Sequence, residues 1–145
     1  MSTTYQSVGE AIYALINAIV ITSVFPGGWG ERHNWPPKQI VAYPAFSVVP
    51  AEDIEEPMDA ITDDDRVTYW VYLTDRYDDA SDAESRMRRL VDLVRTEVRR
   101  GKRNPTILGG AYALGRISGV WGANVEQGER FYRLSLEVRV DQSLV

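Results

Sequence analysis

The chain has 145 residues, a formal net charge of −5 and no cysteine. Its length suits one domain that buries a core of its own, and a hydrophobic fraction of 44% excludes wholesale disorder. The lack of cysteine excludes disulfides, thiolate metal sites and cysteine nucleophiles.

An N-terminal helix is predicted to begin near Ser7. Ser7 and Glu10 have the spacing of a capping box, in which each side chain satisfies a free amide of the first turn. Apolar residues follow at helical intervals until Thr22, and the Pro-Gly-Gly sequence at 26–28 ends the pattern. The stretch is short and interrupted by polar residues, so we expect neither a signal peptide nor a membrane span.

Residues 25–38 are rich in glycine, proline and tryptophan, which predicts a mobile loop. Its two indoles, Trp29 and Trp35, must either fold back onto the domain or contact a partner. The single histidine, His33, lies between them without a second imidazole or a thiol. We therefore expect it to be an exposed loop residue rather than a metal ligand.

A strand is predicted over residues 40–49, interrupted at Pro44 and therefore at a sheet edge for part of its length. Residues 50–65 then hold eight acids and no base, which predicts a mobile, solvated loop. The run lacks the glycine and glutamate spacing of a calcium loop, so no metal site is expected. The eight acids are Glu52, Asp53, Glu55, Glu56, Asp59, Asp63, Asp64 and Asp65.

Residues 66–76 alternate with apolar or aromatic side chains on both faces, which predicts a central strand. The clearest helix begins at Ser81, whose spacing to Glu84 matches a second capping box, and ends at Gly101. Its arginines crowd toward the C-terminal end, where the helix dipole favours cations. The basic group at this end comprises Arg95, Arg99, Arg100, Lys102 and Arg103.

Residues 111–121 and 130–140 predict a long antiparallel hairpin with a mobile tip at 122–129. The second strand alternates between a dry face, from Tyr132 to Val140, and a wet face that contains Arg133. The elements together predict one α+β domain over residues 1–145. Its sheet is expected to be four-stranded and mostly antiparallel, with two helices packed on the dry face.

The charges divide unevenly along the chain. Residues 1–65 carry ten acids and two bases, whereas residues 66–145 carry eleven acids and fourteen bases. Surfaces of unlike charge favour contact between copies of the chain over general nucleic-acid binding. The sequence has no motif for a catalytic nucleophile or a phosphate loop, so we expect neither an enzyme nor a cofactor.

The order of these elements resembles that of the tail terminator, or tail completion, proteins of long-tailed, siphovirus-like bacteriophages. The resemblance spans nearly the whole chain. It rests on the N-terminal helix, the segments 43–50 (YPAFSVVP) and 68–73 (TYWVYL), the acidic stretch between them, the helix after Ser81 and the final hairpin with 131–138 (FYRLSLEV).

The resemblance implies a virion protein that forms a ring, commonly of six subunits, at the head-proximal end of the tail. Such a ring is assembled in the host cytoplasm, caps the tail tube, ends tube polymerisation and provides the surface to which the head attaches. It contacts the tail tube protein and the head connector or neck proteins, and DNA passes through its channel without specific binding. No membrane is involved.

Two placements of the charged groups stay open under this reading. The acidic residues 52–65 and the basic group are either opposed patches of neighbouring subunits or the lumen and outer faces of the ring. A head-closure or neck connector protein of the same virion is one alternative function. A non-viral ligand-binding module that uses the loop of Trp29 and Trp35 is another.

Overall fold

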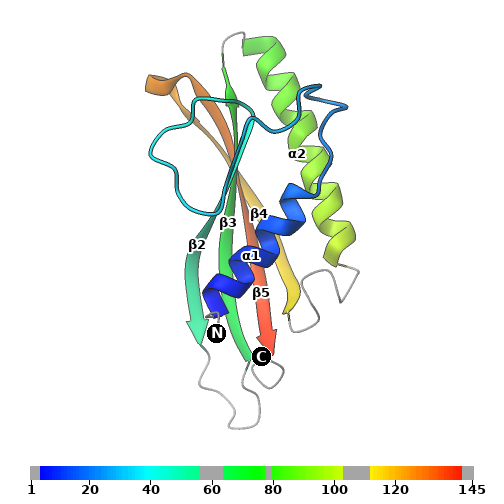
Figure 1. The fold of residues 1–145 in the computed structure, drawn as a ribbon, viewed down its shortest axis with the longest axis vertical. Coiled ribbons are helices and arrows are strands. Elements are labelled where there is room, and N and C mark those ends of the chain that lie inside the picture. The colour runs from blue at the N-terminus through cyan, green and yellow to red at the C-terminus, as the bar shows by residue number, and fades with distance from the viewer. Residues whose placement is uncertain (1–3, 56–63, 78–79, 103–111, 142–145) are drawn as a thin grey trace.

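The computed structural model describes residues 4–55, 64–77, 80–102 and 112–141. These residues form two α-helices, five strands and one 3-10 turn. Figure 1 shows how they are arranged. The elements are α1 (Thr4–Asn17), β1 (Glu31–His33), β2 (Ala45–Glu55), β3 (Asp64–Arg76), α2 (Ala80–Lys102), β4 (Tyr112–Asn124), η1 (Val125–Gln127) and β5 (Glu129–Asp141).

The strands form one sheet in the order β1-β2-β3-β5-β4. All neighbours are antiparallel except β1 and β2, which run parallel. The predicted α+β class and the two predicted helices are confirmed, but the sheet has five strands rather than four. The additional strand is Glu31–His33, which pairs with Ala45–Ser47 inside the segment expected to be a loop.

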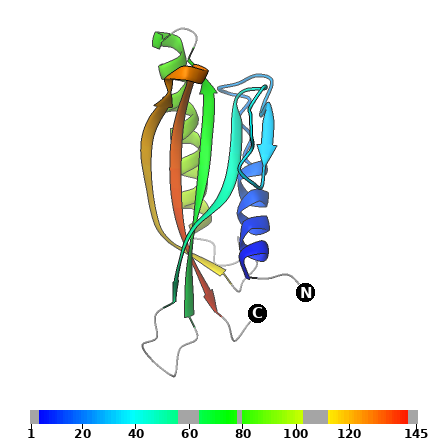
Figure 2. The same ribbon diagram turned by 90° about the vertical axis from the view of Figure 1, so that its left-hand side faces the viewer.

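Both helices lie over one face of the sheet, and the core fills the space between the two layers (Figures 1 and 2). The period of two in β3 and β5 explains this, because alternate residues of a strand point to one face. In register, Val71 lies opposite Leu134 and Leu73 opposite Tyr132. The buried hydrophobic residues of the two central strands are Val67, Tyr69, Val71, Leu73, Tyr132, Leu134, Leu136 and Val138. From the helices come Val8, Ile12, Ile16, Met87, Leu90, Val94 and Val98.

Both helices begin earlier than their predicted caps. Helix α1 begins at Thr4, so Ser7 lies inside it and the capping box at that position is wrong. Helix α2 begins at Ala80, and the carboxylate of Glu84 accepts hydrogen bonds from Arg130 and Arg88. The helix also continues through Gly101, which is buried within it rather than placed after its end.

The acidic segment is less of a loop than its charge suggested. Strand β2 continues through Pro50 to Glu55, with a bulge between Pro50 and Glu52, and β3 begins at Asp64. Glu52, Asp53, Glu55, Asp64 and Asp65 therefore belong to strands, because pairing with neighbouring strands supports an extended backbone that local charge alone disfavours. Glu56, Asp59 and Asp63 lie outside the described residues. These ends of β2 and β3, together with the end of β5, extend past the helical layer (Figure 2).

The final hairpin is longer than predicted. Strands β4 and β5 extend to Asn124 and from Glu129, so most of the expected tip at 122–129 is regular structure. The turn η1 closes on Gly128, whose φ of 64° lies in the left-handed region that favours glycine. The carbonyl oxygen of Gly128 accepts a hydrogen bond from the Tyr77 amide at 2.9 Å, which ties the tip to the end of β3.

A charged link joins the helical layer to the sheet. Arg130 of β5 donates two hydrogen bonds to the carboxylate of Glu84 on α2, at 2.9 and 3.1 Å. Arg130 also donates to the carbonyl oxygen of Gly122 at 3.0 Å and lies over the ring of Trp121. The hydrogen bond from Arg130 outweighs the effect of burial and holds the pKa of Glu84 below its ordinary value of 4.5.

This link predicts a pH-dependent stability. Because the pKa of Glu84 is lower in the folded chain than in the unfolded chain, its contribution is fully present above about pH 4.5 and is lost as the pH falls through the folded value. Glu84→Gln should lower the free energy of unfolding at pH 7 by about 1–3 kcal/mol. Urea denaturation should show this difference shrinking at pH 3, while the exposed control Glu126→Gln changes little at either pH. An equal loss for Glu84→Gln at both pH values would contradict the link.

Candidate functional site

Apart from Val20 on the helical layer, the most exposed apolar side chains lie in the loop after β1 and at the end of β4. At the β1 edge, in the loop that joins β1 to β2, Trp35 is 59% exposed and Val41 is 69% exposed. At the β4 edge, Val120 is 51% exposed and Val125, in the turn after β4, is 87% exposed. The loop does not stay at its own edge, because its residue Ile40 lines one hollow together with Asn124, at the end of β4.

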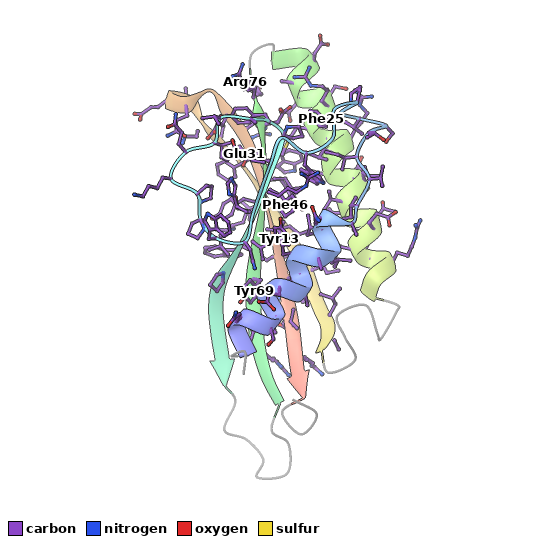
Figure 3. All side chains as sticks on the ribbon, viewed as in Figure 1. Tyr13, Phe25, Glu31, Phe46, Tyr69 and Arg76 are labelled. Carbon is purple, nitrogen blue, oxygen red and sulfur yellow. The ribbon has the colours of Figure 1, made fainter. Side chains whose placement is uncertain are left out.

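The loop at the β1 edge is held in shape by Glu31. Its Oε2 accepts hydrogen bonds from the amides of Val41 and Ala42 at 2.5 and 2.6 Å, and its Oε1 lies 2.7 Å from Nε2 of His33. Glu31 is labelled in Figure 3. Burial acts to raise the pKa of Glu31, but the hydrogen bonds from Ala42, His33 and Val41 outweigh it and keep this pKa below its ordinary value. His33 is therefore a half-buried residue of β1 that supports the loop, not an exposed loop residue.

A second contact ties the same loop to the far strands. The hydroxyl of Tyr43 donates to Oε2 of Glu129 at 2.6 Å and lies 3.1 Å from the carbonyl oxygen of Ile40. Burial and the Glu129 carboxylate raise the pKa of Tyr43 to about 12, so its proton stays in place at neutral pH. Arg76 lies over the Tyr43 ring. Together with Glu31, these contacts order a segment that its proline and glycine content alone predicts to be mobile.

The two tryptophans of the predicted contact loop have different places. Trp29 is only 6% exposed and meets the ring of Phe46 edge to face, with 4.8 Å between the ring centroids. Its burial in the core corrects its assignment to a partner-contact loop. Trp35 stays at the surface, where its ring packs against that of His33. The ligand-binding alternative requires a pocket lined by both indoles, but neither indole lines the four hollows described for this part of the chain.

The basic group at the end of α2 is also divided. Arg95 points inward and donates to the hydroxyl of Tyr132. Arg99 and Arg100 are exposed, and Arg100 pairs with Glu97 at 3.0 Å on the same helix. The side chain of Lys102 and the whole of Arg103 lie outside the described residues. Of the described part of this group, only Arg99 and Arg100 form an exposed basic surface.

An apolar groove lies beside this surface. It has a volume of about 500 Å³ and separates the end of α1 from the second half of α2. Its lining residues are Leu15, Ala18, Ile19, Val20, Leu93, Glu97, Arg100 and Gly101. Val20 is exposed on its rim, so the helical layer also offers an apolar surface to solvent.

The outer face of the sheet, which points away from the helices, was only partly expected. Trp70, Tyr72 and Phe131 form a row of half-buried rings on it, with centroids 6.3 and 5.9 Å apart between neighbours. The guanidinium of Arg133 lies over Trp70. The alternating pattern predicted that Arg133 lies on the wet face. Its contact with Trp70 could not be predicted, because it depends on β3 and β5 being neighbours in the sheet.

The described residues provide no group of three or more histidine, cysteine, aspartate or glutamate side chains placed to hold a metal ion. Neither α1 nor α2 is both long and apolar enough to cross a membrane. No family model matches the chain, and no curated protein matches it either. The surfaces described above are therefore the basis for any functional assignment.

Proposed function

We propose that this protein is a structural subunit of a long-tailed bacteriophage virion, in which copies form a ring that caps the tail tube. The ring ends tube polymerisation and provides the surface to which the head attaches. It acts by assembly rather than by catalysis. Its partners are further copies of itself, the tail tube protein below it and the neck proteins above it. The family resemblance implies six copies in the ring.

One observation carries this proposal: exposed apolar residues lie on separate elements of the chain, namely the loop between β1 and β2, the end of β4 with the turn after it, and the segment after α1. A ring is built from heterologous contacts, in which one patch of a subunit meets a different patch of the next copy. A body that offers more than one apolar patch suits such an arrangement. Val41 and Trp35 form the first patch, and Val120 and Val125 form the second.

The charged segments support the same reading. The ends of β2 and β3 carry acids and extend past the helical layer, as Figure 2 shows. Such acids either line the channel of the ring, where they repel the phosphates of DNA and let the duplex pass, or meet a basic surface of the next copy. The exposed Arg99 and Arg100 lie on the helical layer, where they are available to a neighbouring subunit or to a tail protein.

A head-closure or neck connector protein of the same virion is the second candidate, because it needs the same kind of ring contact. The two candidates differ in the surface to which the ring binds. A terminator binds the end of tail tubes that lack their cap, whereas a neck protein binds filled heads. Incubation of the purified protein with each, followed by electron microscopy, distinguishes them.

Charge placed at either edge should disrupt the ring. Negative-stain electron microscopy and light scattering of the wild-type protein, alone and with uncapped tail tubes, should show rings with a central hole. Val125→Glu and Val41→Glu should each weaken assembly by about tenfold or more, because a charge in an apolar contact must be desolvated. Both residues are exposed, so the fold should not change.

Val20→Glu is the comparison, since it introduces the same charge at an exposed valine beside the groove of the helical layer and so tests that layer as the alternative contact. It should assemble like the wild type. A protein that stays monomeric at all salt and protein concentrations and binds neither tubes nor heads would overturn the proposal. Normal rings from both edge variants would remove the edges as the contact.

A further inference from the structure

The outer face of the sheet holds an arginine that lacks an ionic partner among the described residues. Arg133 of β5 lies with its guanidinium carbon 4.4 Å from the centre of the Trp70 ring. Its Nε is buried and has no hydrogen-bond acceptor within the described part of the chain. A buried donor without an acceptor costs free energy, so this nitrogen favours a ligand that supplies an oxygen.

Two hollows lie on this face, and Trp70 lines both of them. The first has a volume of about 320 Å³ and is mostly apolar, with Val49, Tyr72 and Phe131 on the sheet and Ile40 on the loop above. The second has a volume of about 270 Å³ and is polar. Its lining residues are Ala51, Thr68, Trp70, Arg116, Ser118, Ser135 and Glu137.

The chemistry of the two hollows defines a ligand with two kinds of group. An apolar side chain fills the first hollow, beside the row of aromatic rings. A carboxylate beside it reaches Arg133 or the exposed Arg116, which also forms no ion pair with a described residue. Arg116 and Glu137 are the charged residues in the lining of the polar hollow, Glu129 is the one in the lining of the apolar hollow, and Arg133 lies over Trp70, which lines both. The ligand class is therefore an acidic peptide with apolar residues between its acids.

We propose that the outer face binds the acidic segment 51–65 of a second copy of this chain. That segment has the required composition, since its acids are interleaved with Ile54, Met58 and Ile61 and it contains no base. Its two described ends belong to strands that extend past the helical layer, where a neighbouring copy can reach them (Figure 2). The inference rests on the proposed ring, because it names a further contact between one subunit and the next.

The test uses the full-length protein, at a concentration where light scattering shows monomer, and a labelled synthetic peptide of residues 51–65. Fluorescence anisotropy should show binding that weakens as salt is added, and Trp70 should contribute a change in intrinsic fluorescence on binding. A control peptide in which every Asp and Glu is replaced by Asn and Gln should bind about tenfold more weakly or not at all.

Arg133→Gln should weaken binding of the acidic peptide by about tenfold or more, because a charge-assisted hydrogen bond is lost. Arg116→Gln is a second test at an exposed residue, where a folding defect is not expected. Arg89→Gln, an exposed arginine on α2, is the matched control and should bind like the wild type. The melting temperature of each variant separates lost binding from lost fold.

The inference is overturned if the acidic peptide does not bind, or if the neutral peptide binds equally well. Binding that survives both Arg133→Gln and Arg116→Gln overturns it as well. Rings seen by electron microscopy without peptide binding leave the proposed function standing and remove only this contact. Peptide binding that depends on Arg133 in a protein that never forms rings supports the contact and counts against the ring.

Discussion

Phe46→Ala is expected to lower the free energy of unfolding by about 3–5 kcal/mol. Phe46 is fully buried on β2, and its ring meets Trp29 edge to face and lies 5.4 Å from that of Tyr13. Tyr13 and Phe46 are labelled in Figure 3. The Phe46 ring thus contacts α1, the segment after α1 and the sheet. Because separate contacts fix these elements, they cannot all move in to fill the cavity that the alanine leaves.

Urea denaturation followed by circular dichroism measures this loss. Phe131→Ala is the matched control, since it removes the same atoms from the half-buried outer face of the sheet. It should cost less than half as much, because solvent already reaches that ring. Equal losses at the two positions would show that Phe46 is not the junction of the core that its contacts indicate.

The elements that the sequence predicted best are those in which a single period decides burial. Strand β3 has apolar or aromatic residues on both faces, and it lies in the sheet between β2 and β5. Helix α2 and strand β5 likewise have stripes that match their buried residues, such as Leu90 and Leu134. In these segments, local pattern and tertiary contact select the same structure.

The sequence could not predict the elements that depend on a distant partner. Strand β1 has three residues, too few for a period, and forms because its backbone pairs with β2. The acids at the ends of β2 and β3 favour solvent locally but are held extended by their neighbours in the sheet. Trp29 and Trp35 both lie in a segment without a regular period, so only the packing of Phe46 against Trp29 distinguishes the core residue from the surface one.

The candidate surfaces were predictable to a similar extent. The alternation of β5 assigned Arg133 to the wet face, but its contact with Trp70 requires the register between β3 and β5. The arginine spacing on α2 indicated a basic end, but it could not show that Arg95 points to Tyr132 while Arg99 stays exposed. Side chains with the same charge therefore divide into structural and surface roles only once the layers are packed.

Two glycines of β4 make room for the large side chains of β5. A methyl group added at Gly119 would overlap the ring of Tyr132, and one added at Gly122 would overlap the ring of Phe131. Tyr132 cannot easily move aside, since it is buried, packs edge to face on Trp121 and accepts a hydrogen bond from Arg95. The glycines are required for close approach, because neither has a positive φ.

Gly119→Ala should therefore lower the free energy of unfolding by about 2–4 kcal/mol, because the displaced Tyr132 ring strains the core and Arg95 loses its acceptor. Gly27→Ala is the control, since an added methyl group meets nothing there and the φ of Gly27 is not positive. Its stability should stay equal or rise slightly. Urea denaturation compares the two variants.

The steric cause is tested by repeating the change in a chain with a smaller residue at 132. In a Tyr132→Leu background the overlap is removed, and alanine is about 0.5–1 kcal/mol more favourable than glycine within a strand. Gly119→Ala should then become neutral or stabilising, which reverses the sign of its effect. A loss of the same size in both backgrounds would assign the cost to the backbone of β4 rather than to Tyr132, and the fit between these two strands would no longer explain the glycine.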